Sequence, residues 1–251
     1  MSNMSSPLSD PTALTAAARP NRVRPVEAWR GIRALIRDPD DTAQVFRVIR
    51  ALAGKSIERG FQKFRSSASG RRILDERRSL VGRLSDRAYL ESLPEESLGR
   101  VYAEFTQREE ISPDGLIDAS TDAPQSELDA ERLLYSERLR DMHDLWHVLT
   151  GYGRDLVGEA ALLAFTYRQT KNRGIGFILA VAYLRAGRRK MPQQRVMIRD
   201  GFRRGASAAW LPAADWEALL ERPLAEVRRT LRIEPVHDYA DVRSLGAPAV
   251  A

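Results

Sequence analysis

Apolar residues recur every three or four positions along most of this chain, which is the spacing of one face of an α-helix. No segment alternates apolar and polar residues with the period of two that marks a half-buried strand. The pattern therefore predicts an all-α fold, with a single multi-helix domain over residues 25–240. The first apolar stripe after Pro25 consists of Val26, Trp29, Ile32, Leu35 and Ile36.

Turn and capping residues divide this pattern into separate helices. Residues 1–24 are rich in Ser, Pro, Ala and Thr, and they predict a disordered tail. The acidic segment 107–128 predicts a long connection that is functional, mobile or plain linker. The expected helices cover residues 26–36, 42–52, 56–64, 74–93 (as one or two helices), 98–105, 127–150, 154–167, 174–184 and a pair between 210 and 231.

Composition excludes some kinds of functional site. The chain has no cysteine, which excludes disulfides, thiolate zinc sites and a cysteine nucleophile. The formal net charge is +6, and nearly all of the positive charge is arginine. This balance indicates an anionic partner, or it reflects a GC-rich genome. The longest uncharged segment, Gly174 to Leu184, has roughly half the length of a membrane-spanning helix.

The strongest chemical signal is the segment His143-Asp144-Leu145-Trp146-His147, followed twelve residues later by Glu159. A spacing of four puts both imidazoles on one helix face. The neighbouring positions are apolar, so these polar side chains need a partner that offsets their desolvation. Small residues around Glu159 would let the next helix approach closely enough for its carboxylate to reach the histidines. We therefore expect a divalent-metal site.

Two familiar metal motifs fit poorly. Zinc proteases use His-Glu-x-x-His with the glutamate as general base, but Asp144 is one methylene shorter and better suited to binding the metal or orienting an imidazole. The phosphohydrolases named for a His-Asp doublet need a histidine upstream of His143, and none exists. The nitrogen and oxygen donors suit zinc, iron, manganese or cobalt, and the spacing does not choose among them.

The motif and its surroundings resemble the fourth coenzyme Q (ubiquinone) biosynthesis protein, the Coq-four family. The resemblance extends over roughly residues 85–235. Besides the His-Asp-x-x-His and Glu159 signature, it is carried by Leu93-Pro94-Glu95-Glu96-Ser97-Leu98-Gly99-Arg100-x-Tyr102, Ser112-Pro113-Asp114, Tyr135, Arg140, Gly158, Trp216-Glu217, Pro223-Leu224-x-x-Val227-Arg228 and Leu231-x-Ile233.

The resemblance implies an all-helical fold and a zinc or related divalent ion held by His143, Asp144, His147 and Glu159. It implies decarboxylation at ring carbon 1 of a polyprenylated hydroxybenzoate precursor of ubiquinone, with or without hydroxylation at the same carbon. It also implies a peripheral place at a membrane surface among other ubiquinone biosynthesis enzymes. We expect the cytoplasmic side of a bacterial inner membrane, with the matrix side of the mitochondrial inner membrane as the alternative. A homodimer is left open.

Within this reading, Asp144 and Glu159 are the candidate catalytic residues, since Asp144 is a fourth ligand or a proton carrier. The arginine-rich tract from Arg185 to Arg204, opposed only by Asp200, would face an anionic membrane surface, or it is an ordinary solvated helix face. A lipid-presenting scaffold with a structural metal is the alternative function. Nucleic-acid recognition is not expected, because no helix-turn-helix, finger or RNA-binding signature appears. Candidates for a prenyl groove, or simply core residues, are Phe165, Ile175, Phe177, Ile178, Val181 and Tyr183.

Overall fold

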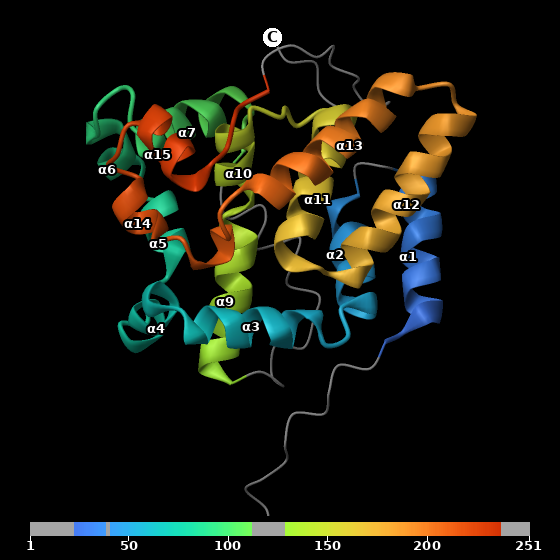
Figure 1. Cartoon of the computed structure of the whole chain (residues 1–251), viewed down its shortest axis with the longest axis horizontal. Coiled ribbons are helices and arrows are strands. Elements are labelled where there is room, and N and C mark those ends of the chain that lie inside the picture. Colours follow the sequence, from blue (N-terminus) through green and yellow to red (C-terminus); the bar gives the residue numbers. More distant parts are fainter. Residues whose placement is uncertain (1–22, 39–40, 112–128, 237–251) are drawn as a thin grey trace, which may run out of the picture.

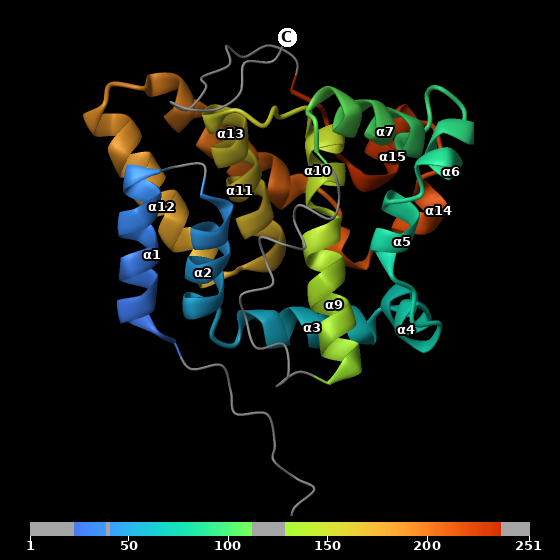
Figure 2. The ribbon, with the colours of Figure 1, turned by 180° about the vertical axis from the view of Figure 1, so that it is seen from behind.

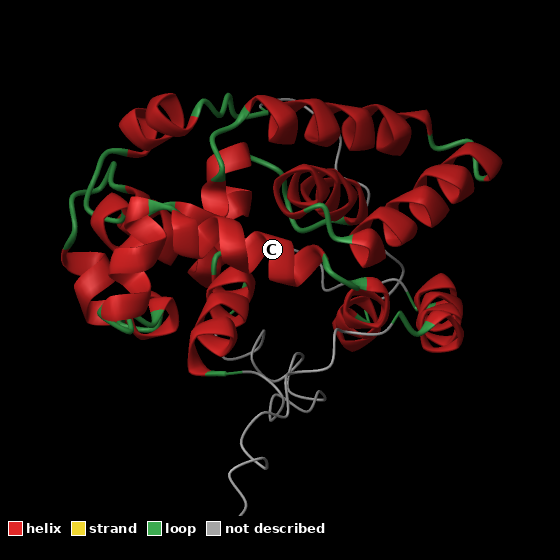
Figure 3. Ribbon diagram, turned by 60° about the horizontal axis from the view of Figure 1, so that its bottom comes forward, coloured by secondary structure: helices red, strands yellow, loops and turns green. Residues whose placement is uncertain are grey.

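The computed structural model describes residues 23–38, 41–111 and 129–236, and these residues form helices joined by short turns. No strand occurs among them, and this confirms the predicted all-α fold (Figure 3). The helices are α1 (Pro25–Arg37), α2 (Thr42–Leu52), α3 (Ser56–Ser66), α4 (Ala68–Asp75), α5 (Leu80–Leu84), α6 (Arg87–Ser92), α7 (Leu98–Arg108), α9 (Ala130–Asp141), α10 (His143–Thr150), α11 (Leu156–Thr170), α12 (Arg173–Arg188), α13 (Pro192–Ser207), η3 (Leu211–Ala213), α14 (Trp216–Leu219) and α15 (Leu224–Leu231).

The helices form two groups on either side of α9, α10 and α11 (Figures 1 and 2). On one side, α1 packs against α2, and α2 packs against α12. On the other side lie α5, α6 and α7 with the C-terminal helices α14 and α15. The largest core cluster is on this second side and includes Tyr102, Trp146, Phe165 and Trp216, all at most 2% exposed. The helix that carries both histidines, α10, therefore contributes to the largest core cluster among the described residues.

Two glycines bring α11 and α13 into very close contact. A Cβ atom on Gly201 would lie 2.0 Å from the backbone carbonyl oxygen of Ala161, and one on Gly205 would lie 2.6 Å from that of Phe165. Any larger residue at these positions would collide with backbone, which cannot move aside as a side chain can. The close contact fixes α11, the helix that carries Glu159, against the centre of the fold.

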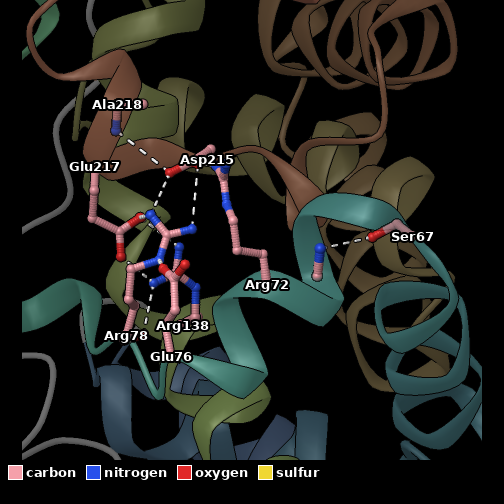
Figure 4. Close-up of polar contacts among 9 residues, drawn as sticks. Ser67, Arg72, Glu76, Arg78, Arg138, Asp215, Glu217 and Ala218 are labelled. Atoms are coloured by element: carbon pink, nitrogen blue, oxygen red, sulfur yellow. Dashed lines mark hydrogen bonds and ion pairs between the residues drawn. The ribbon is translucent and has the colours of Figure 1, made fainter.

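A buried ion-pair network connects α9 to the C-terminal part of the chain (Figure 4). The Arg138 side chain is 1% exposed, and its two terminal nitrogens donate to the two carboxylate oxygens of Glu217 at 2.6 and 2.9 Å. Arg78 donates to Asp215 at 2.8 Å, and Arg72 also contacts Asp215. Because a charge-assisted, bidentate pair has a narrow geometry, this network fixes the position of α9 and hence the start of α10.

The structure corrects several details of the sequence prediction. The single helix expected over 127–150 is two helices, α9 and α10, which are separated by a one-residue turn at Met142. The list of expected helices did not include α13, whose segment was described only as part of the arginine-rich tract, on a membrane-facing surface or a solvated helix face. Trp29 was placed in the first apolar stripe, yet it is 56% exposed. The predicted disordered tail lies, apart from Val23 and Arg24, outside the described residues, as do residues 112–128 of the long connection.

Across the described residues, none of the helices is both long enough and apolar enough to cross a lipid bilayer.

Candidate metal site

The two histidines belong to α10, and Glu159 belongs to the first turn of α11. Gly151 ends α10 with a φ of 77°, a left-handed conformation that favours glycine. The Asp155 carboxylate then caps α11 by accepting hydrogen bonds from the backbone N–H groups of Val157 and Gly158 at 2.9 and 3.2 Å. This tight corner turns the chain back, so that the first turn of α11 faces α10.

The structure brings the predicted site residues together. The Nε2 atoms of His143 and His147 lie 3.3 Å apart. The Glu159 carboxylate points at both, with one oxygen 3.4 Å from His147 Nε2 and the other 3.8 Å from His143 Nε2. Asp144 joins the histidines from the same helix, and the nearest ligand atoms of these three residues lie within 4.8 Å of one another. Two consecutive helices thus supply four potential ligands.

His147 is held in one orientation. Its Nδ1–H donates to the backbone carbonyl of Tyr152 at 2.9 Å, because a carbonyl oxygen can only accept. The neutral ring therefore presents an unprotonated Nε2 toward His143 and Glu159. The ring of Phe105, from α7, stacks on the imidazole with a centroid distance of 5.8 Å. Such outer partners usually fix a metal-binding histidine.

Helix α13 holds Tyr152, the residue whose carbonyl accepts the hydrogen bond from His147. The buried Tyr152 donates its phenolic O–H to the Asp200 carboxylate at 2.8 Å. Asp200 also accepts hydrogen bonds from Arg203 at 2.9 Å and Arg204 at 2.5 Å. The single acid of the arginine-rich tract thus connects that tract to the site.

The last part of the described chain supplies hydrogen-bond donors to the backbone carbonyl groups at the C-terminal end of α10. Arg228 of α15 donates to the carbonyl oxygens of Leu149 and Val148 at 3.0 and 2.8 Å. The backbone N–H of Val236 donates to the Thr150 carbonyl at 2.7 Å. These bonds occupy carbonyl groups that a helix terminus otherwise leaves without partners.

Charge and burial make the site suited to a cation. Burial, followed by the charge of His147, lowers the pKa of His143. Burial opposes protonation of His147, but the Glu159 carboxylate outweighs it and raises the pKa of His147. Burial would raise the pKa of Glu159, but the histidines lower it to about 2. A negative carboxylate between two imidazoles is an arrangement that attracts a positive ion.

The spacing of the donor atoms fits a metal ion. Nitrogen ligands at roughly 2.0–2.1 Å from a tetrahedral zinc ion lie roughly 3.3–3.4 Å apart. The two Nε2 atoms lie 3.3 Å apart and the nearer Glu159 oxygen lies 3.4 Å from one of them. The site is open on one side, because the His143 and Glu159 side chains are 28% and 34% exposed while that of His147 is fully buried. A ligand can therefore reach the site from that side.

Asp144 and Tyr102 are both buried, and the charge of Asp144 acts on the Tyr102 phenol. Asp144 is 4% exposed, and Tyr102 on α7 is 1% exposed. Burial first, and then the charges of Asp144 and Asp141, raise the pKa of Tyr102. Tyr102 therefore keeps its proton at neutral pH.

The candidate prenyl-groove residues do not share one environment. Phe165 is completely buried and packs edge-on against Trp146, at a centroid distance of 5.8 Å, so it fills the main core. Ile175 and Ile178 are at most 8% exposed. Phe177, Val181 and Tyr183 are partly buried along α12. Only these last three, of the six candidates, offer much surface to a ligand.

Sequence reasoning missed Tyr152, Asp200 and Arg228 as parts of the site. Tyr152 and Asp200 are separated by 48 residues, and Arg228 lies 79 residues beyond Leu149. A local pattern cannot show contacts of this range. The one available signal was Asp200 itself, as the single acid among many arginines.

Comparison with known proteins places the chain in a family. The family model described as coenzyme Q (ubiquinone) biosynthesis protein Coq4 matches residues 25–237. The chain belongs to the Coq4 family. The resemblance expected from the His-Asp-x-x-His motif and its flanks is thereby confirmed.

Fungal Coq4 proteins are among the similar sequences. The chain is 35% identical over 180 residues to mitochondrial ubiquinone biosynthesis protein coq4 of Talaromyces stipitatus, covering 72% of this chain and 61% of that protein. It is 31% identical over 179 residues to the mitochondrial coq-4 protein of Neurospora crassa, covering 71% of this chain and 50% of the other. The match thus spans half to about three-fifths of these relatives.

A crystal structure of a Nostoc punctiforme PCC 73102 protein has a similar fold. The TM-score is 0.64 at 21% sequence identity, and the superposition covers 84% of this chain and 98% of the other. At this identity the likeness supports the helical architecture alone.

Proposed function

We propose that this protein acts in ubiquinone biosynthesis and that it removes the carboxylate from ring carbon 1 of a polyprenylated hydroxybenzoate, with or without hydroxylation at that carbon. The observation that carries the proposal is the convergence of His143, His147 and Glu159, whose donor atoms lie 3.3 to 3.8 Å apart. Membership of the Coq4 family and the names of the fungal relatives support the pathway.

His143, His147 and Glu159 would hold a divalent cation, with Asp144 as the fourth ligand or as a proton carrier. Zinc fits the donor set and its spacing best, and Fe²⁺, Co²⁺ or Mn²⁺ are alternatives. When bound, such an ion supplies Lewis acidity toward a phenolate or carboxylate oxygen of the substrate.

The side chains around the ion would prepare the substrate for loss of CO2. The hydrogen bond to Tyr152 occupies Nδ1 of His147, so that Nε2 is the ring nitrogen directed into the site. A proton delivered from the Asp144 side adds to ring carbon 1, and the bond from that carbon to the carboxylate then breaks. CO2 leaves, and the bonding electrons return to the ring, assisted by the para oxygen. The products are CO2 and the prenylated phenol.

The proposed substrate and the exposed face of α1 both indicate a membrane as a partner. A polyprenylated aromatic lipid resides in a bilayer, so we propose a peripheral place at an anionic membrane, near other ubiquinone biosynthesis enzymes. The outer face of α1 supports this, because Val26 and Trp29 are 64% and 56% exposed. Arg30 and Arg33 lie beside them, and positive charge favours anionic lipid. The relatives are named as mitochondrial proteins, which favours the mitochondrial alternative over the bacterial one.

One assay tests the catalytic proposal. Purified protein is loaded with Zn²⁺, its metal content is measured by mass spectrometry, and CO2 release is followed from a prenylated 4-hydroxybenzoate. We expect one bound ion and turnover, with both lost in His147→Ala and metal content reduced in Glu159→Gln. Glu95→Gln, a change of the same type in a turn, should behave as wild type. Binding of both metal and lipid without turnover would exclude the enzyme and leave a scaffold with a structural metal.

A further inference from the structure

Helix α13 contacts both halves of the candidate metal site from two neighbouring positions. Gly201 lets its backbone lie against α11, since a Cβ atom there would be 2.0 Å from the Ala161 carbonyl oxygen. Glu159 lies two residues before Ala161 on the same helix. The residue before Gly201, Asp200, accepts the phenolic hydrogen bond of Tyr152 at 2.8 Å. One helix therefore fixes the segment that carries the glutamate and the residue that binds the histidine.

Tyr152 depends on its side chain for its position. It lies between Gly151 and Gly153, and glycine restricts the backbone less than any other residue. Its backbone N–H donates to the Thr150 hydroxyl at 3.4 Å, which is long for such a bond. The side chain, by contrast, is buried, and its O–H forms a bond of normal length to α13. The side chain therefore holds the carbonyl that accepts the hydrogen bond from His147.

Asp200 is a carboxylate that is fixed in place to accept this bond. Arg203 donates to its Oδ1 at 2.9 Å, and Arg204 donates to its Oδ2 at 2.5 Å. Burial would raise the pKa of Asp200, but the hydrogen bonds from the two arginines and Tyr152 lower it. The Arg204 side chain is 17% exposed and that of Arg203 is 73% exposed, so water weakens the Arg203 pair more. Asp200 is therefore ionised at neutral pH and held mainly by Arg204.

We propose that Asp200 is a positioning residue of the metal site, which acts on His147 through Tyr152. The inference rests on the proposed function, since it concerns what holds a proposed ligand. A metal-binding imidazole is oriented by the group that binds its second nitrogen, and loss of that group weakens metal binding. Here that group is a backbone carbonyl, whose place is set by the side-chain bond to Asp200. The acid is not a ligand, so its effect is on the orientation of the ring.

NMR of the imidazole nitrogens in the apo protein tests this orientation without any metal. The chain has three histidines, and the His147 side chain is fully buried. Its Nδ1–H should therefore exchange slowly with water in wild type. Asp200→Ala should speed this exchange by about tenfold or more, because the accepting carbonyl is no longer held. Asp200→Glu, which keeps a carboxylate, should recover part of the protection. An unchanged exchange rate in Asp200→Ala would overturn the inference.

Zn²⁺ affinity, measured by competition with a chelator, tests the route from Asp200 to the site. Asp200→Ala should bind zinc about tenfold more weakly than wild type. Tyr152→Phe breaks the same hydrogen bond from its other end. The double variant should therefore lose no more affinity than Asp200→Ala alone, because the two residues act as one unit. Losses that add in the double variant would mean that Asp200 acts by another route, and the inference would be overturned.

A matched control and the apo measurement separate this inference from the proposed function. Glu221→Ala removes another acid that accepts a tyrosine hydroxyl, that of Tyr89 at 3.0 Å, and should change neither the exchange rate nor the zinc affinity. Thermal unfolding shows that each variant is folded. If wild type binds no zinc, the proposed function fails, and the exchange rate of the His147 Nδ1–H still decides the role of Asp200. If wild type binds zinc and Asp200→Ala binds it equally well, the role of Asp200 is overturned and the proposed function stands.

Discussion

The phenolic O–H of Tyr152 donates to Asp200 at 2.8 Å, while the backbone carbonyl of the same tyrosine accepts from His147 at 2.9 Å. One residue thus links α13 to the imidazole on α10. The side-chain bond fixes the tyrosine, and the fixed tyrosine keeps its carbonyl in position. The orientation of His147 therefore depends on an acid 53 residues further along the chain.

Tyr152→Phe should weaken zinc binding without removing any ligand. The backbone carbonyl remains, but the tyrosine loses its anchor, so we expect a loss of about tenfold or less in Zn²⁺ affinity. The free energy of unfolding should fall by about 1 kcal/mol. Competition with a chelator measures the affinity. Tyr89→Phe, which removes a hydrogen bond of 3.0 Å to Glu221 at the surface, is the matched control and should bind zinc normally.

Gly201→Ala should destabilise the protein by about 1–3 kcal/mol, because the added methyl group collides with the Ala161 carbonyl oxygen. Gly82→Ala in α5 should have the opposite effect, since nothing lies within 4 Å of the added Cβ atom and alanine favours a helix by about 0.5–1 kcal/mol. Urea unfolding measures the change in the free energy of unfolding for both variants. Equal effects would contradict the close contact between α11 and α13.

Acidification should remove the contribution that the ion-pair network in Figure 4 makes to the free energy of unfolding. Burial would raise the pKa of Asp215, but hydrogen bonds and charge from Arg78 lower it below its ordinary value. A carboxyl group with a lowered folded-state pKa stabilises the protein above its unfolded pKa of about 3.9 and loses this effect as the pH falls through its folded pKa.

Asp215→Asn should therefore be less stable than wild type near pH 6, and the difference should shrink below about pH 4. Denaturant unfolding at several pH values measures this. Asp75→Asn, at the end of α4, removes a carboxylate outside this network and is the control for the loss of one charge. A difference that is constant down to pH 2 would mean that Asp215 acts through packing rather than charge.

Trp29→Ser should reduce binding to vesicles of anionic phosphatidylglycerol by about tenfold, because an exposed tryptophan on a helix with flanking arginines inserts into the interface. Phe202→Ser removes another exposed aromatic residue, 43% exposed on α13, whose ring is already held by Tyr167 at 6.1 Å and Arg168 at 4.7 Å, so its loss should reduce binding much less. Vesicle flotation measures the fraction of each variant that binds. Equal losses, or equal binding to neutral vesicles, would contradict a docking role for α1.

Local patterns in the sequence predict the helices well where apolar spacing and caps agree. Asp41 and Gly151 mark ends that the structure shows. The pattern fails for α13, whose buried side consists of Gln194, Met197, Ile198, Gly201 and Gly205 rather than large apolar residues. Small residues give a weak hydrophobic signal, although Gly201 and Gly205 allow α11 and α13 to pack in very close contact.

The orientation of an individual residue is harder to predict. Helix α1 has apolar residues on two faces, and only the packing against α2 shows that Ala28 and Ile32 face inward and Val26 and Trp29 outward. At the site, the spacing of His143 and His147 predicts their shared face. The partners that orient them come from distant segments, so they depend on the tertiary fold.

The bonds from Arg228 and Val236 to the end of α10 have a consequence for biogenesis. A nascent chain that has emerged only as far as α13 already contains every proposed ligand, but the helix presenting the histidines still has open carbonyl groups at its terminus. Its final anchoring must wait until the last described residues have left the ribosome. Metal acquisition is therefore expected to follow, rather than guide, completion of the polypeptide.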